Sequence, residues 1–130
     1  MIRTNSLNES IYLLQRAFHT RGMYPILRDK RTIEYVTTVA KFSMSFMPGN
    51  RRTIITHGVL VEPQFRNRGE GRKLLQLREN LAKEAGVNLL LATVKNDNIV
   101  EIHLLQTSGW IRFTSRRDTK TALWGKRLHD

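Results

Sequence analysis

The sequence predicts a mixed α/β domain, because strand-like alternation, helix-like periodicity and one strand–helix–strand unit follow one another along 130 residues. Apolar residues alternate with serine from Phe42 to Phe46, and leucines recur at helical spacing between Arg72 and Ala85. The unit from Thr53 to Val94 implies two parallel strands. Because no repeat or flexible linker interrupts the chain, we expect one domain over residues 1–130.

The amino-terminal part predicts a helix followed by an ambiguous segment. Ser6 and Glu9 form a capping box, so a helix should begin near Leu7. The apolar residues on one face of this helix are Leu7, Ile11, Leu14 and Phe18. From about Arg31 to Thr38 the pattern suits either a short second helix or a strand, and we favour the helix.

The next segments predict an antiparallel hairpin and a buried strand. The alternating residues Phe42 to Phe46 are followed by a Pro48–Asn50 turn and a second strand from Thr53 to Val61. After the helix of residues 72–85, the nearly continuous apolar run from Asn88 to Val94 is typical of a central strand buried on both faces.

The carboxyl-terminal part predicts a short helix and a final hairpin. Asn98 followed by Glu101 is a helix amino-terminal cap, and Gly109 ends that helix. The ranges 110–114 and 121–128 then read as two strands joined by a polar turn.

The charge is strongly basic. Lys and Arg total 22 against 11 Asp and Glu, which gives a formal net charge of +11 and a pI near 10.9. Such a charge attracts polyanions, including nucleic acid, acidic proteins and multiply phosphorylated cofactors. A solvated basic surface without a specific partner explains the same charge equally well.

Several classes of function are disfavoured by what the sequence lacks. The absence of cysteine excludes disulfides, thiolate metal sites and cysteine nucleophiles. No apolar run approaches the roughly 20 residues of a membrane span, and the polar residues 1–9 contain no signal-peptide core. We therefore expect a cytoplasmic protein without a membrane partner. The histidines show no ligand spacing, so no metal is expected.

The most informative segment is a basic glycine-containing turn between a strand and a helix. Its residues are Arg66, Asn67, Arg68, Gly69, Glu70, Gly71 and Arg72. A helix start leaves backbone N–H groups unpaired and carries positive partial charge, which makes it an anion site. The segment lacks the third glycine of the dinucleotide fingerprint. It also lacks the Gly-Lys-Ser/Thr of the Walker loop. A purely structural turn is the alternative.

This segment resembles the coenzyme A signature of the GNAT N-acetyltransferases, Gln/Arg-x-x-Gly-x-Gly/Ala after a strand and a Val-x-Pro sequence. Arg66, Gly69 and Gly71 match its fixed positions. Downstream, Asn98 and the Gly109–Trp110 pair keep a spacing found in many family members. The resemblance covers the chain from Thr53 to Leu128. A shorter resemblance, around Leu105 to Gly109, is to GNAT-like proteins of tailed phages.

The resemblance implies a GNAT-like acyl-CoA N-acyltransferase fold, with a central V-shaped mixed sheet flanked by helices. Acetyl-CoA would be the co-substrate, with its pantetheine held by the backbone around Leu60 and Val61. Backbone N–H groups from about Arg68 to Arg72 would hold the pyrophosphate, and Asn98 would complete the cofactor site. The acetyl group would pass directly to an amine.

His57 is the predicted catalytic base. It lies on the strand before the turn and resembles the position of a base histidine proposed for serotonin N-acetyltransferase. Strand alternation places it on the face of Ile55, Val59 and Val61. A structural histidine with a backbone partner is the alternative, and Glu62 is a second candidate base.

One position departs from the family pattern. Where many members have a tyrosine that protonates the leaving thiolate, this chain has Leu105. Leucine cannot donate a proton; Ser108 and Tyr35 are the remaining candidate donors, and a thiolate can also leave without help.

Three functions compete. The first is an acetyl-CoA-dependent N-acetyltransferase whose acceptor is an amine, with an acidic protein or RNA favoured over a polycation by the charge. The second is a GNAT-like scaffold of weak or no activity that binds a protein or nucleic acid. The third is a nucleic-acid-binding module, suggested by the basic pairs 51–52, 116–117 and 126–127 but backed by no known motif. A homodimer is compatible with the family.

Overall fold

The computed structural model describes residues 7–61, 69–114 and 120–128, which form three helices and one seven-stranded sheet. The helices are α1 (Leu7–His19), α2 (Glu70–Glu84) and α3 (Ile99–Thr107). The strands are β1 (Ile26–Asp29), β2 (Thr32–Val36), β3 (Ala40–Met47), β4 (Asn50–Val61), β5 (Leu89–Lys95), β6 (Ile111–Thr114) and β7 (Thr121–Arg127). Their order in the sheet is β1-β2-β3-β4-β5-β7-β6, and none of the described helices is long and apolar enough to cross a membrane.

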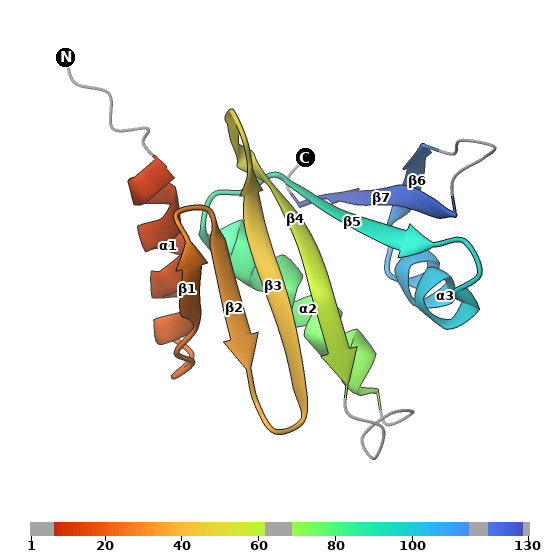
Figure 1. Cartoon of the computed structure of the whole chain (residues 1–130), viewed down its shortest axis with the longest axis horizontal. Coiled ribbons are helices and arrows are strands. Elements are labelled where there is room, and N and C mark those ends of the chain that lie inside the picture. The colour runs from red at the N-terminus through yellow and green to blue at the C-terminus, as the bar shows by residue number, and fades with distance from the viewer. Residues whose placement is uncertain (1–6, 62–68, 115–119, 129–130) are drawn as a thin grey trace.

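The mixed sheet confirms the predicted fold class. β1 to β4 form an antiparallel meander, β4 and β5 pair in parallel, and β7 lies between β5 and β6 with antiparallel neighbours. The predicted hairpin of β3 and β4, the parallel pair and the final hairpin are all present. Figure 1 shows β4 and β5 separating toward their carboxyl ends, which gives the sheet its V shape.

The helix favoured for residues 31–38 was wrong, because this segment is strand β2. Ile33 lies opposite Met44 of β3 and is fully buried, so the alternation of the segment matches that of its neighbour. The Thr32 and Ser45 hydroxyls are 2.7 Å apart. Pairing with β3 and the β-branched side chains of the segment favour the pleated conformation.

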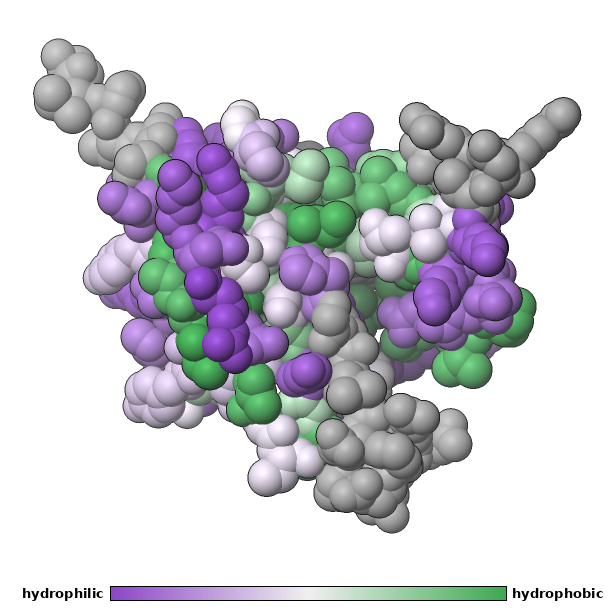
Figure 2. All heavy atoms as spheres, viewed as in Figure 1, coloured by the Kyte–Doolittle hydropathy of each residue, from purple (hydrophilic) through white to green (hydrophobic). Residues whose placement is uncertain are grey.

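The helices cover one face of the sheet. The Phe18 ring of α1 stacks on Phe42 of β3. Arg78 of α2 lies over the same Phe42 ring and donates a hydrogen bond to Thr56 of β4. Figure 1 looks onto the opposite face, with α2 behind β3 and β4, and Figure 2 shows hydrophobic residues over the middle of that face. The alternation predicted for β3 is confirmed, because Phe42, Met44 and Phe46 all belong to the core.

The burial predicted for β5 on both faces is confirmed only for its first half. Leu90, Leu91 and Ala92 are buried, but Thr93 is exposed. Phe113 of β6 and Leu91 both pack over Gly125 of β7. A Cβ at Gly125 would lie only 2.8 Å from the Phe113 ring, so this contact requires glycine.

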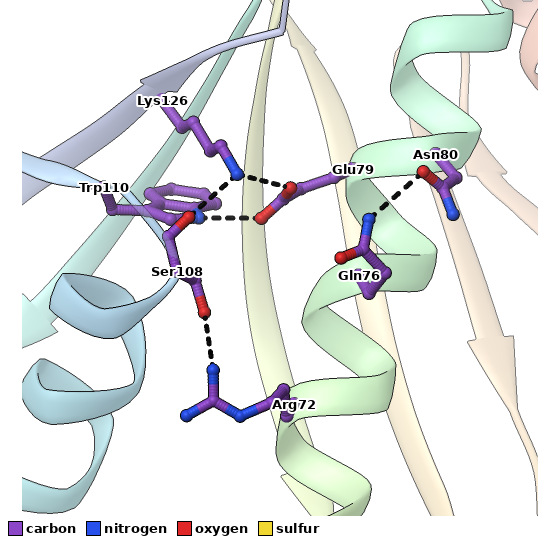
Figure 3. Close-up of polar contacts among 7 residues, drawn as sticks. All are labelled: Arg72, Gln76, Glu79, Asn80, Ser108, Trp110 and Lys126. Carbon is purple, nitrogen blue, oxygen red and sulfur yellow. Dashed lines mark hydrogen bonds and ion pairs between the residues drawn. The ribbon is translucent and has the colours of Figure 1, made fainter.

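A buried polar contact joins α2, α3 and β7 (Figure 3). The Glu79 carboxylate, 4% exposed, accepts hydrogen bonds from Trp110 Nε1 at 3.0 Å and Lys126 Nζ at 2.8 Å. Lys126 Nζ also donates to the Ser108 carbonyl at 2.8 Å, where it faces the negative end of α3. Because the carboxylate is desolvated, its partners determine whether its burial is tolerated.

We predict that Lys126→Met lowers the free energy of unfolding by about 2 kcal/mol, because it leaves the Glu79 carboxylate short of its charged donor. Urea denaturation measures this effect. The double variant Glu79→Gln, Lys126→Met should recover part of the loss. The control is Lys73→Met, whose exposed pair with Glu70 at 3.7 Å should contribute no more than about 0.5 kcal/mol; an equal loss in both variants would contradict the prediction.

Candidate functional site

The separation of β4 and β5 leaves two backbone edges facing each other. The parallel ladder runs from Thr53–Leu89 to Thr56–Ala92, and no β4–β5 pair follows it within the described residues. Beyond that point β4 remains paired only with β3, and β5 only with β7. The inner N–H and C=O groups of β4 up to Leu60 and Val61 are therefore available to an extended polar ligand that binds as a strand does.

The predicted anion site falls at the start of α2, the helix that follows β4. Gly69 is the residue before the helix, with φ of 77°, and no side chain caps the helix. The N–H groups of Glu70, Gly71 and Arg72 therefore lack a helical acceptor and lie at the positive end of the helix dipole. Arg66, Asn67, Arg68 and Glu62 were also predicted for this site and lie outside the described residues.

The Arg72 side chain binds α3. Its guanidinium donates to Thr107 Oγ1 at 3.0 Å and Ser108 Oγ at 3.3 Å, at the carboxyl end of that helix. Figure 3 shows Arg72 and Lys126 approaching Ser108 from α2 and β7. Arg72 thus fixes the first turn of α2 against α3, and its predicted contact with a ligand depends on its backbone N–H.

His57 lies on β4 one residue beyond the last parallel pair, at the base of the separation. The side chain is exposed on the uncovered face of the sheet, the face predicted by alternation with Ile55. Its Nε2 is 3.0 Å from Ser45 Oγ, and Ser45 is in turn bonded to Thr32. This chain of hydroxyls can orient the ring and carry a proton away from it.

Leu105 and the two candidate proton donors, Ser108 and Tyr35, are less accessible than His57. Leu105 is 1% exposed and belongs to the core. The Ser108 hydroxyl accepts a hydrogen bond from Arg72, and Tyr35 packs between Phe18 and Phe42 on the helix-covered face. None of these three side chains shares the exposed face of His57.

Asn98 has the capping role that its spacing predicts. Its side chain accepts a hydrogen bond from the Glu101 N–H at 3.2 Å, at the start of α3. Its part in cofactor binding stays a prediction. Across the described ranges, no group of three or more His, Asp or Glu side chains is placed to hold a metal ion.

Sequence reasoning missed a buried arginine behind the separation of the strands. Arg78 of α2 is 2% exposed, and its Nη1 donates to Thr56 Oγ1 at 2.9 Å. Burial lowers the pKa of Arg78 to about 10. The signal was present, since Arg78 is four residues after Leu74 and three before Leu81 and therefore on the apolar face of the helix.

Comparison with known proteins gives matches both in sequence and in structure. The model of the acetyltransferase (GNAT) family matches residues 4–110. The L-amino acid N-acyltransferase MnaT of Escherichia coli K12 is 33% identical over 94 residues, which are 71% of this chain and 53% of MnaT. The chain therefore spans about half the length of this curated relative.

Solved structures share the architecture at lower identity. A GNAT-family acetyltransferase from Streptococcus pneumoniae has a TM-score of 0.62 at 16% identity, covering 95% of this chain and 93% of that one. yncA from Salmonella typhimurium, solved with its cofactor acetyl-CoA, has a TM-score of 0.64 at 19% identity, with 76% and 66% covered. These likenesses establish the fold.

We predict that Gly69→Ala lowers the free energy of unfolding by about 1 kcal/mol, because Gly69 has a left-handed conformation that side chains disfavour. Gly71→Ala is the matched control. A Cβ there would meet Leu104 at an ordinary 3.5 Å, and alanine favours the helix interior. Urea denaturation of both variants should show loss only for Gly69→Ala; equal stability of the two would contradict the conformational argument.

Proposed function

The chain belongs to the acetyltransferase (GNAT) family, and from this premise we propose that it transfers an acetyl group from acetyl-CoA directly to an amine. The observation that carries the proposal is the separation of β4 and β5 ahead of an uncapped helix start. Together they provide a backbone edge for pantetheine and N–H groups for pyrophosphate. The presence of acetyl-CoA in the structure of yncA supports this cofactor.

The proposed reaction needs one base and produces one thiolate. His57 takes the proton from the ammonium form of the acceptor, and the neutral nitrogen attacks the thioester carbonyl. A C–N bond forms, the nitrogen releases its second proton to solvent, the C–S bond breaks, and coenzyme A leaves as a thiolate. Because Leu105 cannot donate, the thiolate takes its proton from solvent, which its modest pKa permits.

The acceptor is an amine, and L-amino acids are the first class to test because the MnaT relative is an L-amino acid N-acyltransferase. The net charge of +11 favours acceptors that carry negative charge and disfavours polycations.

A scaffold without catalytic activity is the second candidate, favoured by the burial of Leu105 in the core at the position of the family's tyrosine. Such a scaffold would still bind acetyl-CoA at the same turn. Turnover, measured separately from binding, distinguishes the two candidates.

We predict that the protein binds acetyl-CoA with micromolar affinity in a calorimetric titration. The double variant Arg66→Ala, Gly69→Glu should lose this binding, because it removes a cation and places a carboxylate and a strained backbone at the pyrophosphate site. Circular dichroism controls for folding of the variant. A folded wild-type protein that binds no acetyl-CoA would refute the proposed cofactor.

We predict that His57→Gln lowers kcat by about 100-fold or more, the range expected for loss of a general base. Release of the coenzyme A thiol with an amino-acid acceptor measures the rate, and acetyl-CoA affinity should be unchanged. The control is His19→Gln, a change at an exposed histidine of α1. An unaltered kcat in His57→Gln would assign the histidine a structural role.

A further inference from the structure

A second candidate site lies where β4 and β5 begin, at the opposite end of β4 from His57. A cavity of about 620 Å³ opens there and is lined by Asn50, Arg52, Thr53, Asn88 and Arg127, among others. The register of the sheet explains why these residues meet: Thr53 lies opposite Leu89, and Leu89 lies opposite Arg127. The fold thus brings together two of the basic pairs that the sequence keeps far apart.

The cationic groups of this cavity have no acidic partner among the described residues. None of the described ion pairs involves the guanidinium of Arg52 or Arg127, while Asn50 Oδ1 accepts from the backbone N–H of Arg52 at 3.0 Å. Thr53 is only 4% exposed and lines the cavity. Its hydroxyl can donate one hydrogen bond to an anion.

The lining has the chemistry that selects a phosphate. None of the described residues that line it carries a carboxylate. Guanidinium groups match the oxygens of a phosphate in a bidentate arrangement, and hydroxyl and amide donors add directed hydrogen bonds. The volume is within the range of small-ligand sites and exceeds what one inorganic anion fills. We propose that this cavity binds the phosphate of a nucleotide, free or within single-stranded RNA.

This site is separate from the proposed acetyl-CoA site. Thr53 and Leu60 lie about 23 Å apart along β4, at about 3.3 Å per residue. A free nucleotide would therefore bind independently of acetyl-CoA, whereas an RNA could reach both ends of the strand. The inference does not depend on acetyl transfer.

Two probes test the proposal: AMP in calorimetry and a fluorescein-labelled short RNA in anisotropy titrations. Each titration is run with and without acetyl-CoA, which separates binding in the cavity from binding at the start of α2. The variant Arg52→Ala, Arg127→Ala should weaken binding at least about tenfold. For RNA, the slope of log affinity against log salt should fall in magnitude by about 1.4, which corresponds to two lost phosphate contacts. Thr53→Val should weaken binding while preserving the side-chain shape.

The matched control is the double variant Arg16→Ala, Lys95→Ala. It removes two exposed positive charges that do not line the cavity. Arg52→Lys, Arg127→Lys keeps the charge and loses the bidentate geometry, so it serves if the alanine variant fails to fold. A loss of binding confined to the cavity variants supports the site. The probe that binds, AMP or RNA, shows whether the phosphate belongs to a free nucleotide or to RNA. Equal losses in the control, or no binding of either probe by wild type, would overturn the proposal. Absence of acetyl-CoA binding alone would count only against the acetyltransferase.

Discussion

The parallel ladder between β4 and β5 ends at Thr56 and Ala92, and the rest of the molecule is arranged around that end. Two strands that continue beyond their shared ladder normally expose backbone groups that cost free energy if they stay unpaired. Here β3 and β7 hold the outer edges of the two strands. Their inner edges can therefore stay apart and serve a ligand without loosening the sheet.

Helix α2 maintains this separation from behind. Arg78 donates to Thr56 at the last paired position, Glu79 binds Trp110 and Lys126, and Arg72 binds the end of α3. These three residues, within about two turns of one helix, connect both arms of the V. The interior of the molecule is consequently polar where the arms meet, and its buried charges depend on the geometry they help to fix.

Local sequence predicted the elements whose signals are local. The capping residues of α3, the alternation of β3 and the glycine before α2 each act within a few positions. β2 was mistaken for a helix because its local pattern suits both structures, and pairing with β3 decides in favour of the strand. The contacts of Glu79, 31 and 47 residues away in the chain, could not be predicted from spacing at all.

The candidate site was predictable to a similar extent. The resemblance pointed to the turn and to His57 as candidates, and alternation gave the correct face for the histidine. The Ser45 and Thr32 hydroxyls that support His57 required the registers of three strands. The cavity at Arg52 and Arg127 likewise exists only because β7 lies beside β5.

The position of β7 also sets an order of assembly. Within the described sheet, β6 pairs with β7 alone, yet β6 precedes β7 in the chain. β6 therefore has no partner in the sheet until β7 has been synthesised and has paired with β5. The amino-terminal meander needs no such later strand, whereas the second arm can close only once β7 is available.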